Sequence, residues 1–248
     1  MRTVIVGDVH GCRSELEALL DRVAFSGGDR LLFVGDLVAR GPDSLGVLDV
    51  ARTTGAIVVR GNHEQKLLDW RHARTNWMRG EAAAKAPIGR MHRDLARSLR
   101  PVDWTLLETS PLFFDLPEHG GRVVHAGLVP GVAFDAQDPQ TLMRIRTVRV
   151  PGLKRGKTNN VLWGAAYEGP PQIVFGHNAA PGLQLHPWAT GLDTGCVYGG
   201  RLTAMVLASG QRIPRAISAR RALLVAEPAA RIWFSPATRT PAESPDAA

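Results

Sequence analysis

Three short apolar runs in the first quarter of the chain share one arrangement, because each is followed by a glycine and then by a polar side chain. The runs cover residues 3–6, 31–34 and 57–60, and their length and composition are typical of buried strands. The polar residues that follow them are Asp8, Asp36 and Asn62. Their spacing suits strand-helix-strand units, so parallel strands would carry these side chains to the carboxyl edge of one sheet, where open sheets bind ligands.

The segments between these runs have the patterns of amphipathic helices. Ser14-Glu15-Leu16-Glu17 has the form of a capping box, and the apolar residues after it trace one helix face as far as Val23. Pro42-Asp43-Ser44 opens a second helix that extends to Arg52. Residues 64–78 continue as a third helix.

Residues 80–110 have a helical pattern without strand partners. Met91, Leu95 and Leu99 are spaced as one face, and Pro101 ends that pattern. Short apolar runs separated by turn residues then follow at residues 112–116, 122–124, 173–175, 202–208 and 232–234. These runs predict a second, more antiparallel sheet. The predicted fold class is therefore α/β, a four-layer α/β/β/α sandwich with a helical cap.

The length and composition predict one domain. With 248 residues and 44% apolar content, the chain can bury a large core, and we expect a single domain over residues 1–235 with the helical cap at about 79–110. Residues 236–248 are small, polar and proline-rich, which is typical of a disordered tail. Cys12 and Cys196 are too few for a disulfide framework and are expected as free thiols. No secretory signal or membrane span is visible, so we expect a soluble cytoplasmic protein with no membrane partner.

The formal charge of +7 and the pI near 10.2 favour an anionic partner, which includes nucleic acid, nucleotide and phosphoprotein. The densest basic cluster has no acidic residue and consists of Arg144, Arg146, Arg149, Lys154, Arg155 and Lys157. Two interpretations of this cluster have equal weight. It forms either an anion-binding surface or a solvent-exposed loop.

Four of the eight histidines follow short strand-like runs or sit beside glycine: His10, His63, His125 and His177. One such histidine is more often a structural residue than a ligand. All four in the same context as two aspartates and an asparagine favour a metal site instead.

The proposed ligand set combines oxygen and nitrogen donors and contains no thiolate: Asp8, His10, Asp36, Asn62, His125 and His177. This composition suits two divalent ions, with Mn favoured and Co, Ni, Fe or Zn as alternatives, better than a structural zinc. Two ions bridged by a carboxylate lie about 3.5–4 Å apart, and they lower the pKa of a bound water towards about 7. Asp36, on the middle motif, is the natural bridge.

The ordered motifs resemble those of the calcineurin-like metallophosphatases, in particular the phosphoprotein phosphatase branch. They are Gly7-Asp8-Val9-His10-Gly11, Gly35-Asp36 through Arg40-Gly41, Gly61-Asn62-His63-Glu64, His125-Ala126-Gly127 and Gly176-His177. The resemblance implies that Asp8 and His10 bind one ion, that Asp36 bridges, and that the second ion is bound by Asn62, His125 and His177. It also implies that His63 is the general acid and that Arg40 holds the phosphate.

Two features point to a subgroup of this branch. Protein Ser/Thr phosphatases carry Asp where this chain has Ala39, and residues 35–45 instead resemble the symmetrical bis(5'-nucleosyl)-tetraphosphatases, as do residues 142–146 and 192–203. This resemblance implies hydrolysis of diadenosine tetraphosphate to two ADP by a hydroxide that the two metals activate. Arg40, Arg144 and Arg146 are then candidates for contact with the polyphosphate, because guanidinium groups bind phosphate oxygens in pairs.

Two alternatives to this function were retained. A protein Ser/Thr phosphatase or a broad phosphomonoesterase would use the same two-metal centre. A nucleic-acid-binding module is suggested only by the pI, and nucleic-acid binding is not expected.

Overall fold

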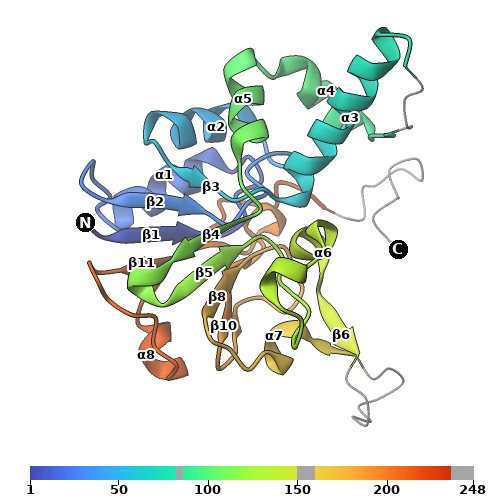
Figure 1. Ribbon diagram of the computed structural model, residues 1–248. Helices are drawn as coiled ribbons and strands as arrows, with labels where there is room; N and C mark the ends of the chain where they lie inside the picture. Colours follow the sequence, from blue (N-terminus) through green and yellow to red (C-terminus); the bar gives the residue numbers. More distant parts are fainter. Residues whose placement is uncertain (82–85, 150–159, 236–248) are drawn as a thin grey trace.

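A computed structural model describes residues 1–81, 86–149 and 160–235 (Figure 1). Its first sheet has the strand order β12-β11-β1-β2-β3. The three predicted parallel strands are confirmed as β1 (Thr3–Val6), β2 (Arg30–Phe33) and β3 (Ile57–Val58). Helices α1 (Arg13–Arg22) and α2 (Ser44–Thr53) connect them, so the strand-helix-strand interpretation is correct.

The second sheet has the order β4-β5-β8-β10-β9 and is mixed. Strand β4 (Phe113–Leu116) is antiparallel to β5 (Gly121–Val124), which is parallel to β8 (Gln172–Phe175). Strand β10 (Ala189–Gly191) is parallel to β8, and β9 (Gln184–Leu185) is antiparallel to β10. A separate hairpin pairs β6 (Thr147–Arg149) with β7 (Asn160–Leu162).

Alternating side chains of the strands build the layers. In β1, Ile5 belongs to the core cluster between the two sheets, whereas Val4 and Val6 face the helices, as the two-residue period of a strand requires. The outer face of the first sheet is covered by α1, α2 and α5 (Pro101–Thr109). The outer face of the second sheet packs against α6 (Pro139–Arg144) and α7 (Trp163–Ala166). The predicted four-layer sandwich is therefore confirmed (Figure 1).

The helical pattern of residues 80–110 corresponds to two helices in the described residues. Helix α4 (Arg90–Ser98) ends three residues before Pro101, and Pro101 then occupies the first turn of α5. Proline is tolerated there because the first amide groups of a helix have no partner within the helix. Helix α3 (Asn62–Met78) precedes them. The predicted limits of the domain and of the cap stay predictions.

Two predicted strands were misassigned. Residues 202–208 were expected in the second sheet, but β11 (Arg201–Leu207) lies in the first sheet, antiparallel to β1. Residues 232–234 do not form a strand, and the edge strand is β12 (Leu224–Pro228). The backbone amides of Trp233 and Phe234 donate instead to the carbonyl of Val197, which lies in the short helix η3 (Cys196–Tyr198). Both short runs are apolar, and the sequence does not reveal which partner covers them.

The predicted capping box at Ser14 is also wrong. Helix α1 begins after Cys12, which makes no side-chain capping bond. Glu15, which is buried, accepts hydrogen bonds from the backbone amide of Ala230 at 3.0 Å and from Trp233 Nε1 at 2.7 Å. Glu15 therefore fastens the segment after β12 to α1.

The remaining helices and cysteines complete the description. Helix α8 (Ile217–Arg221) and the short helices η1 (Pro117–His119) and η2 (Phe134–Ala136) lie in connections. Cys12 and Cys196 are buried free thiols, as predicted. None of the helices in the described ranges combines the length and the apolar character that a bilayer span needs. The predicted tail at 236–248 lies outside the described residues.

We predict that Glu15→Ala lowers the free energy of unfolding by about 1–3 kcal/mol, because two partly buried hydrogen bonds to a carboxylate are lost. Glu17→Ala, two residues away on the exposed face of α1, is the matched control and should change the stability by at most about 0.5 kcal/mol. Urea denaturation of both variants measures the difference. Equal stabilities would show that Glu15 does not fasten the C-terminal segment.

Candidate metal centre

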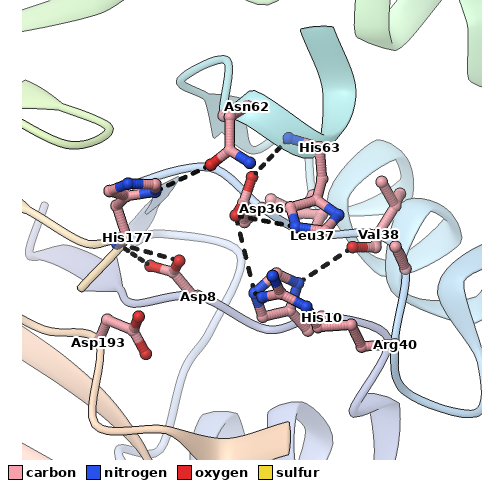
Figure 2. Close-up of polar contacts among 12 residues, drawn as sticks. Asp8, His10, Asp36, Leu37, Val38, Arg40, Asn62, His63, His177 and Asp193 are labelled. Carbon is pink, nitrogen blue, oxygen red and sulfur yellow. Dashed lines mark hydrogen bonds and ion pairs between the residues drawn. The ribbon is translucent and has the colours of Figure 1, made fainter. Parts of the chain in front are cut away.

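Loops that follow strands of both sheets converge on one site between them (Figure 2). The first sheet supplies Asp8 and His10 after β1, Asp36 after β2, and Asn62 and His63 at the start of α3. The second sheet supplies His125 after β5 and His177 after β8. The structure therefore brings together all six predicted ligands, although they come from five separate segments.

The backbone of these loops is strained. Among the described residues, six that are not glycine have positive φ, and five of them lie at this site: His10, Asp36, Ala39, Arg40 and His177. Residues other than glycine adopt a positive φ at a cost of about 1–3 kcal/mol each, and such residues cluster at functional sites. Glycine is required beside them, because a Cβ at Gly61 would overlap the Asp36 carboxylate and one at Gly176 would overlap that of Asp8.

Asp36 is the centre of the arrangement. Its side chain accepts a hydrogen bond from the backbone amide of His63 at 3.0 Å. Its two oxygens lie 3.7 Å from His10 Nε2 and 3.5 Å from His125 Nε2. A buried carboxylate between histidines from two different sheets is in the position that a bridging ligand needs.

The outer hydrogen bonds of His10 and His125 fix which nitrogen faces Asp36. The Nδ1 of His10 lies 3.1 Å from the carbonyl of Val38, and the Nδ1 of His125 lies 3.0 Å from that of Val34. A carbonyl oxygen only accepts, so each Nδ1 carries the hydrogen. In a neutral ring the lone pair is then on Nε2, directed at the centre, which is the usual arrangement of a metal-binding histidine.

His177 is oriented in the same way with its nitrogens exchanged. Its Nε2 lies 3.1 Å from the carbonyl of Arg144, which leaves Nδ1 directed at Asn62 Oδ1 at 2.9 Å. Asn62 Oδ1 is also 3.1 Å from His125 Nε2. The backbone amide of His177 donates to the carboxylate of Asp8 at 3.0 and 3.1 Å, and this bond joins the loops of the two sheets.

Two carboxylates of the site, Asp8 and Asp193, lack enough compensating positive charge. Burial and the neighbouring Asp193 raise the pKa of Asp8 well above its usual range, and burial raises the pKa of Asp193 to about 6. Burial alone would lower the pKa of His125, but the charge of Asp36 outweighs it and raises this pKa to about 10. A site that draws a proton onto a fully buried histidine attracts cations.

The donors fit divalent ions. Two groups of donor atoms, each within 4.8 Å of one another, share Asp36: His10, Asp36 and His63 form one, and Asp36, His125 and His177 form the other. Burial lowers the pKa of His10 and of His177 to about 3, so both rings are neutral and have a lone pair to offer. Neutral imidazole with carboxylate and amide oxygen suits first-row divalent metals. Asp8 lies at the side of the second group, next to Asp193 (Figure 2).

The two predicted catalytic residues lie at the edge of this centre. Arg40 Nη1 donates to His10 Nε2 at 2.6 Å. The positively charged guanidinium therefore contacts the lone pair that His10 directs at the centre. His63 is 2% exposed, and its Nε2 has no hydrogen-bond partner among the described residues. That nitrogen is 4.0 Å from an oxygen of Asp36. Burial, against the opposing charge of Asp36, holds the pKa of His63 well below its usual range.

The predicted arginine track is only partly described. The carbonyl of Arg144 contacts His177, whereas its guanidinium is exposed and donates to Gln140 at 3.0 Å. Arg146 is also exposed, and its charge acts on His177. Three further basic residues of the cluster lie outside the described ranges: Lys154, Arg155 and Lys157. Substrate contacts by Arg144 and Arg146 stay predictions.

Sequence reasoning assigned no role to Glu64. This residue is completely buried, and its carboxylate accepts hydrogen bonds from the amides of Asp36, Leu37 and Gly61, each at 2.9 Å, and from that of Val38 at 3.3 Å. It therefore clamps the loop after β2 to the loop after β3. The signal was present, since a glutamate three residues after the helix-capping position is the second half of a capping box.

Two other residues were missed for different reasons. Asp193 follows β10 in the same manner as the aspartates of the first sheet, but it was not among the residues predicted for the site. His92 on α4 lies 2.9 Å from His63 through their ring nitrogens. It occurs in a helical stretch without a motif, so nothing in the sequence singled it out.

The family described as calcineurin-like phosphoesterase matches residues 1–207 of this chain. A symmetrical bis(5'-nucleosyl)-tetraphosphatase of Chromohalobacter salexigens is 34% identical over 85% of this chain and 96% of its own length. An asymmetrical bis(5'-nucleosyl)-tetraphosphatase of Halalkalibacterium halodurans, PrpE, is 30% identical over 83% of this chain and 89% of its own length. A crystal structure described as a putative diadenosine tetraphosphatase superposes with a TM-score of 0.73 and 35% identity, covering 92% of this chain and 93% of that one.

We predict that Glu64→Ala lowers the free energy of unfolding by about 3–5 kcal/mol, because several buried amides lose a charged acceptor together. The same variant should bind Mn²⁺ more weakly, since the loop of Asp36 is no longer fixed. Asp69→Ala on the exposed face of α3 is the control. Chemical denaturation and titration calorimetry with Mn²⁺ measure both effects. An unchanged affinity for Mn²⁺ in a folded Glu64→Ala protein would exclude the clamp.

Proposed function

The chain belongs to the calcineurin-like phosphoesterase family of metal-dependent enzymes with dinuclear centres, and on that premise we propose that it hydrolyses diadenosine tetraphosphate symmetrically, to two ADP. One observation carries the proposal: five buried or nearly buried donors from two sheets surround the Asp36 carboxylate, with an arginine at the rim. The relatives whose names specify this class of substrate cover most of the chain, which supports it.

The proposed ligands divide as the resemblance implies. Asp8 and His10 would hold one ion and Asp36 would bridge, while Asn62, His125 and His177 would hold the other. Manganese is the metal we propose. Two such ions, when bound, neutralise the charge of the phosphates and lower the pKa of a water so that it can attack phosphorus at neutral pH.

The remaining residues act on the substrate. Arg40 would bind phosphate oxygens, since its guanidinium is always charged and already lies at the centre, on His10. His63 would act at the oxygen that leaves phosphorus, because its free Nε2 faces the same region as Asp36. Arg144 and Arg146 would extend the contact along the polyphosphate from the His177 side.

Symmetrical cleavage rests on residues 35–45, 142–146 and 192–203, which resemble the symmetrical enzymes. A phosphoprotein phosphatase with the same centre is the alternative. Ala39 disfavours it, because the protein Ser/Thr phosphatases carry there an aspartate that would favour the charged form of the catalytic histidine, and a serine or threonine oxygen is a strongly basic leaving group that needs a proton. A phosphate oxygen of ADP is a weakly basic leaving group, so it needs less proton donation.

The decisive experiment is product analysis. Purified protein with Mn²⁺ is incubated with diadenosine tetraphosphate, and the nucleotides are separated by ion exchange. We expect two molecules of ADP from each substrate. ATP with AMP would establish the asymmetrical reaction, and turnover of a phosphopeptide without turnover of the dinucleotide would overturn the proposed substrate.

Substitutions of Asp36 and of His63 distinguish the proposed bridging of the two metals from the proposed action on the leaving oxygen. Asp36→Asn should abolish detectable turnover and remove the thermal stabilisation by Mn²⁺, because the bridge between the ions is lost. His63→Ala should keep the metal content and lower kcat by about 10²–10⁴-fold. Differential scanning fluorimetry, elemental analysis and steady-state kinetics provide the readouts. Loss of one metal in His63→Ala would mean that His63 is a ligand.

A further inference from the structure

The first turn of helix α4 touches both residues proposed to act on the substrate. The backbone amide of Arg40 donates to Met91 Sδ at 3.1 Å, and His92 Nε2 lies 2.9 Å from His63 Nδ1. Arg40 and Ala39 have consecutive positive φ values of 71° and 72°. A loop in that conformation needs outside contacts to persist, and α4 supplies one.

His92 is a buried polar residue on the inward face of α4. It is 4% exposed, and the buried residues of α4 are His92 and Ala96, one turn apart. An apolar side chain would fill this position at lower cost, because a buried imidazole must keep its hydrogen bonds. One contact that His92 makes is with His63, and the two rings are nearly parallel, with 23° between their planes.

The direction of this hydrogen bond decides what His63 can do. A neutral imidazole carries a single hydrogen. If His92 donates to Nδ1, that hydrogen must be on Nε2, where it can be donated to a substrate oxygen. If His63 donates from Nδ1, its Nε2 has a lone pair instead and becomes a further ligand, since it lies in one donor group with His10 and Asp36.

We propose that His92 is a positioning residue that donates Nε2–H to His63 Nδ1, so that His63 acts as a donor toward the leaving oxygen and stays off the metal. This inference rests on the role of His63 in the proposed function. When the bond from phosphorus to the leaving oxygen breaks, its electron pair goes to that oxygen. The Nε2–H of His63 is donated to the oxygen and stabilises the developing charge, and solvent supplies any proton that the product later takes.

The test compares two substitutions of similar size. His92→Gln keeps an amide that can donate, and His92→Leu fills the space without a polar atom. His72→Leu, on the exposed face of α3, is the matched control. We expect His92→Leu to lower kcat by about 10-fold with KM nearly unchanged, and His92→Gln to restore most of it. With aryl phosphates, the loss should be larger for phenyl phosphate than for p-nitrophenyl phosphate, whose leaving oxygen is less basic.

Two readouts distinguish positioning from a merely structural effect. In a His63→Ala background, His92→Leu should cause no further loss of kcat, because its effect passes through His63. In the metal-free protein, correlation of ¹⁵N and ¹H shifts of labelled histidine should show the Nε2–H tautomer of His63, lost in His92→Leu. The Nδ1–H tautomer in the native protein, or an equal loss in both backgrounds, would overturn the proposal.

The outcomes also separate this inference from the proposed function. Aryl phosphates report on the centre whether or not diadenosine tetraphosphate is the substrate. If His63→Ala leaves kcat unchanged with every substrate, the proposed role of His63 fails. If His63→Ala lowers kcat and His92→Leu does not, only the role of His92 fails.

Discussion

The burial of negative charge between two sheets is the constraint on which the site depends. Asp8, Asp36 and Asp193 are each at most 6% exposed, and carboxylates in such a place are stable only if positive charge compensates them. In the protein alone that compensation falls on His125, whose pKa rises to about 10. Divalent cations meet the same demand with more charge. The buried negative charge that raises the pKa of His125 would therefore also favour the binding of divalent ions.

The second requirement is that the charges be held at fixed positions against their repulsion. The loop after β2 contains residues in left-handed conformations, and Glu64 accepts hydrogen bonds from amides of this loop and from the amide of Gly61 after β3. The carbonyls of Val34 and Val38 orient His125 and His10 from behind. These contacts use backbone groups at strand ends, whose positions the sheets already determine. The rigid sheets therefore fix the positions of the side chains proposed as ligands.

Helix α4 adds a contribution from outside the sandwich. The sheets fix the metal ligands, whereas Arg40 and His63 lie at the rim, where each also contacts α4 through Met91 or His92. Arg40 and His63 therefore depend on α4 as well as on the loops that they share with Asp36 and Asn62.

The sequence by itself determined the parallel half of the fold and predicted the six donor residues that the structure brings together. Each of the motifs at Asp8, Asp36 and Asn62 follows a strand directly, so local order along the chain is also spatial order at the sheet edge. Only the tertiary structure decided where short apolar runs pair: β11 joined the first sheet, and residues 232–234 formed no strand. It also decided the partners of Glu15, Glu64 and His92, because a side chain that bonds to a segment far away in sequence leaves no periodic signal. Periodicity records which face of an element is buried, but it does not record what lies against that face.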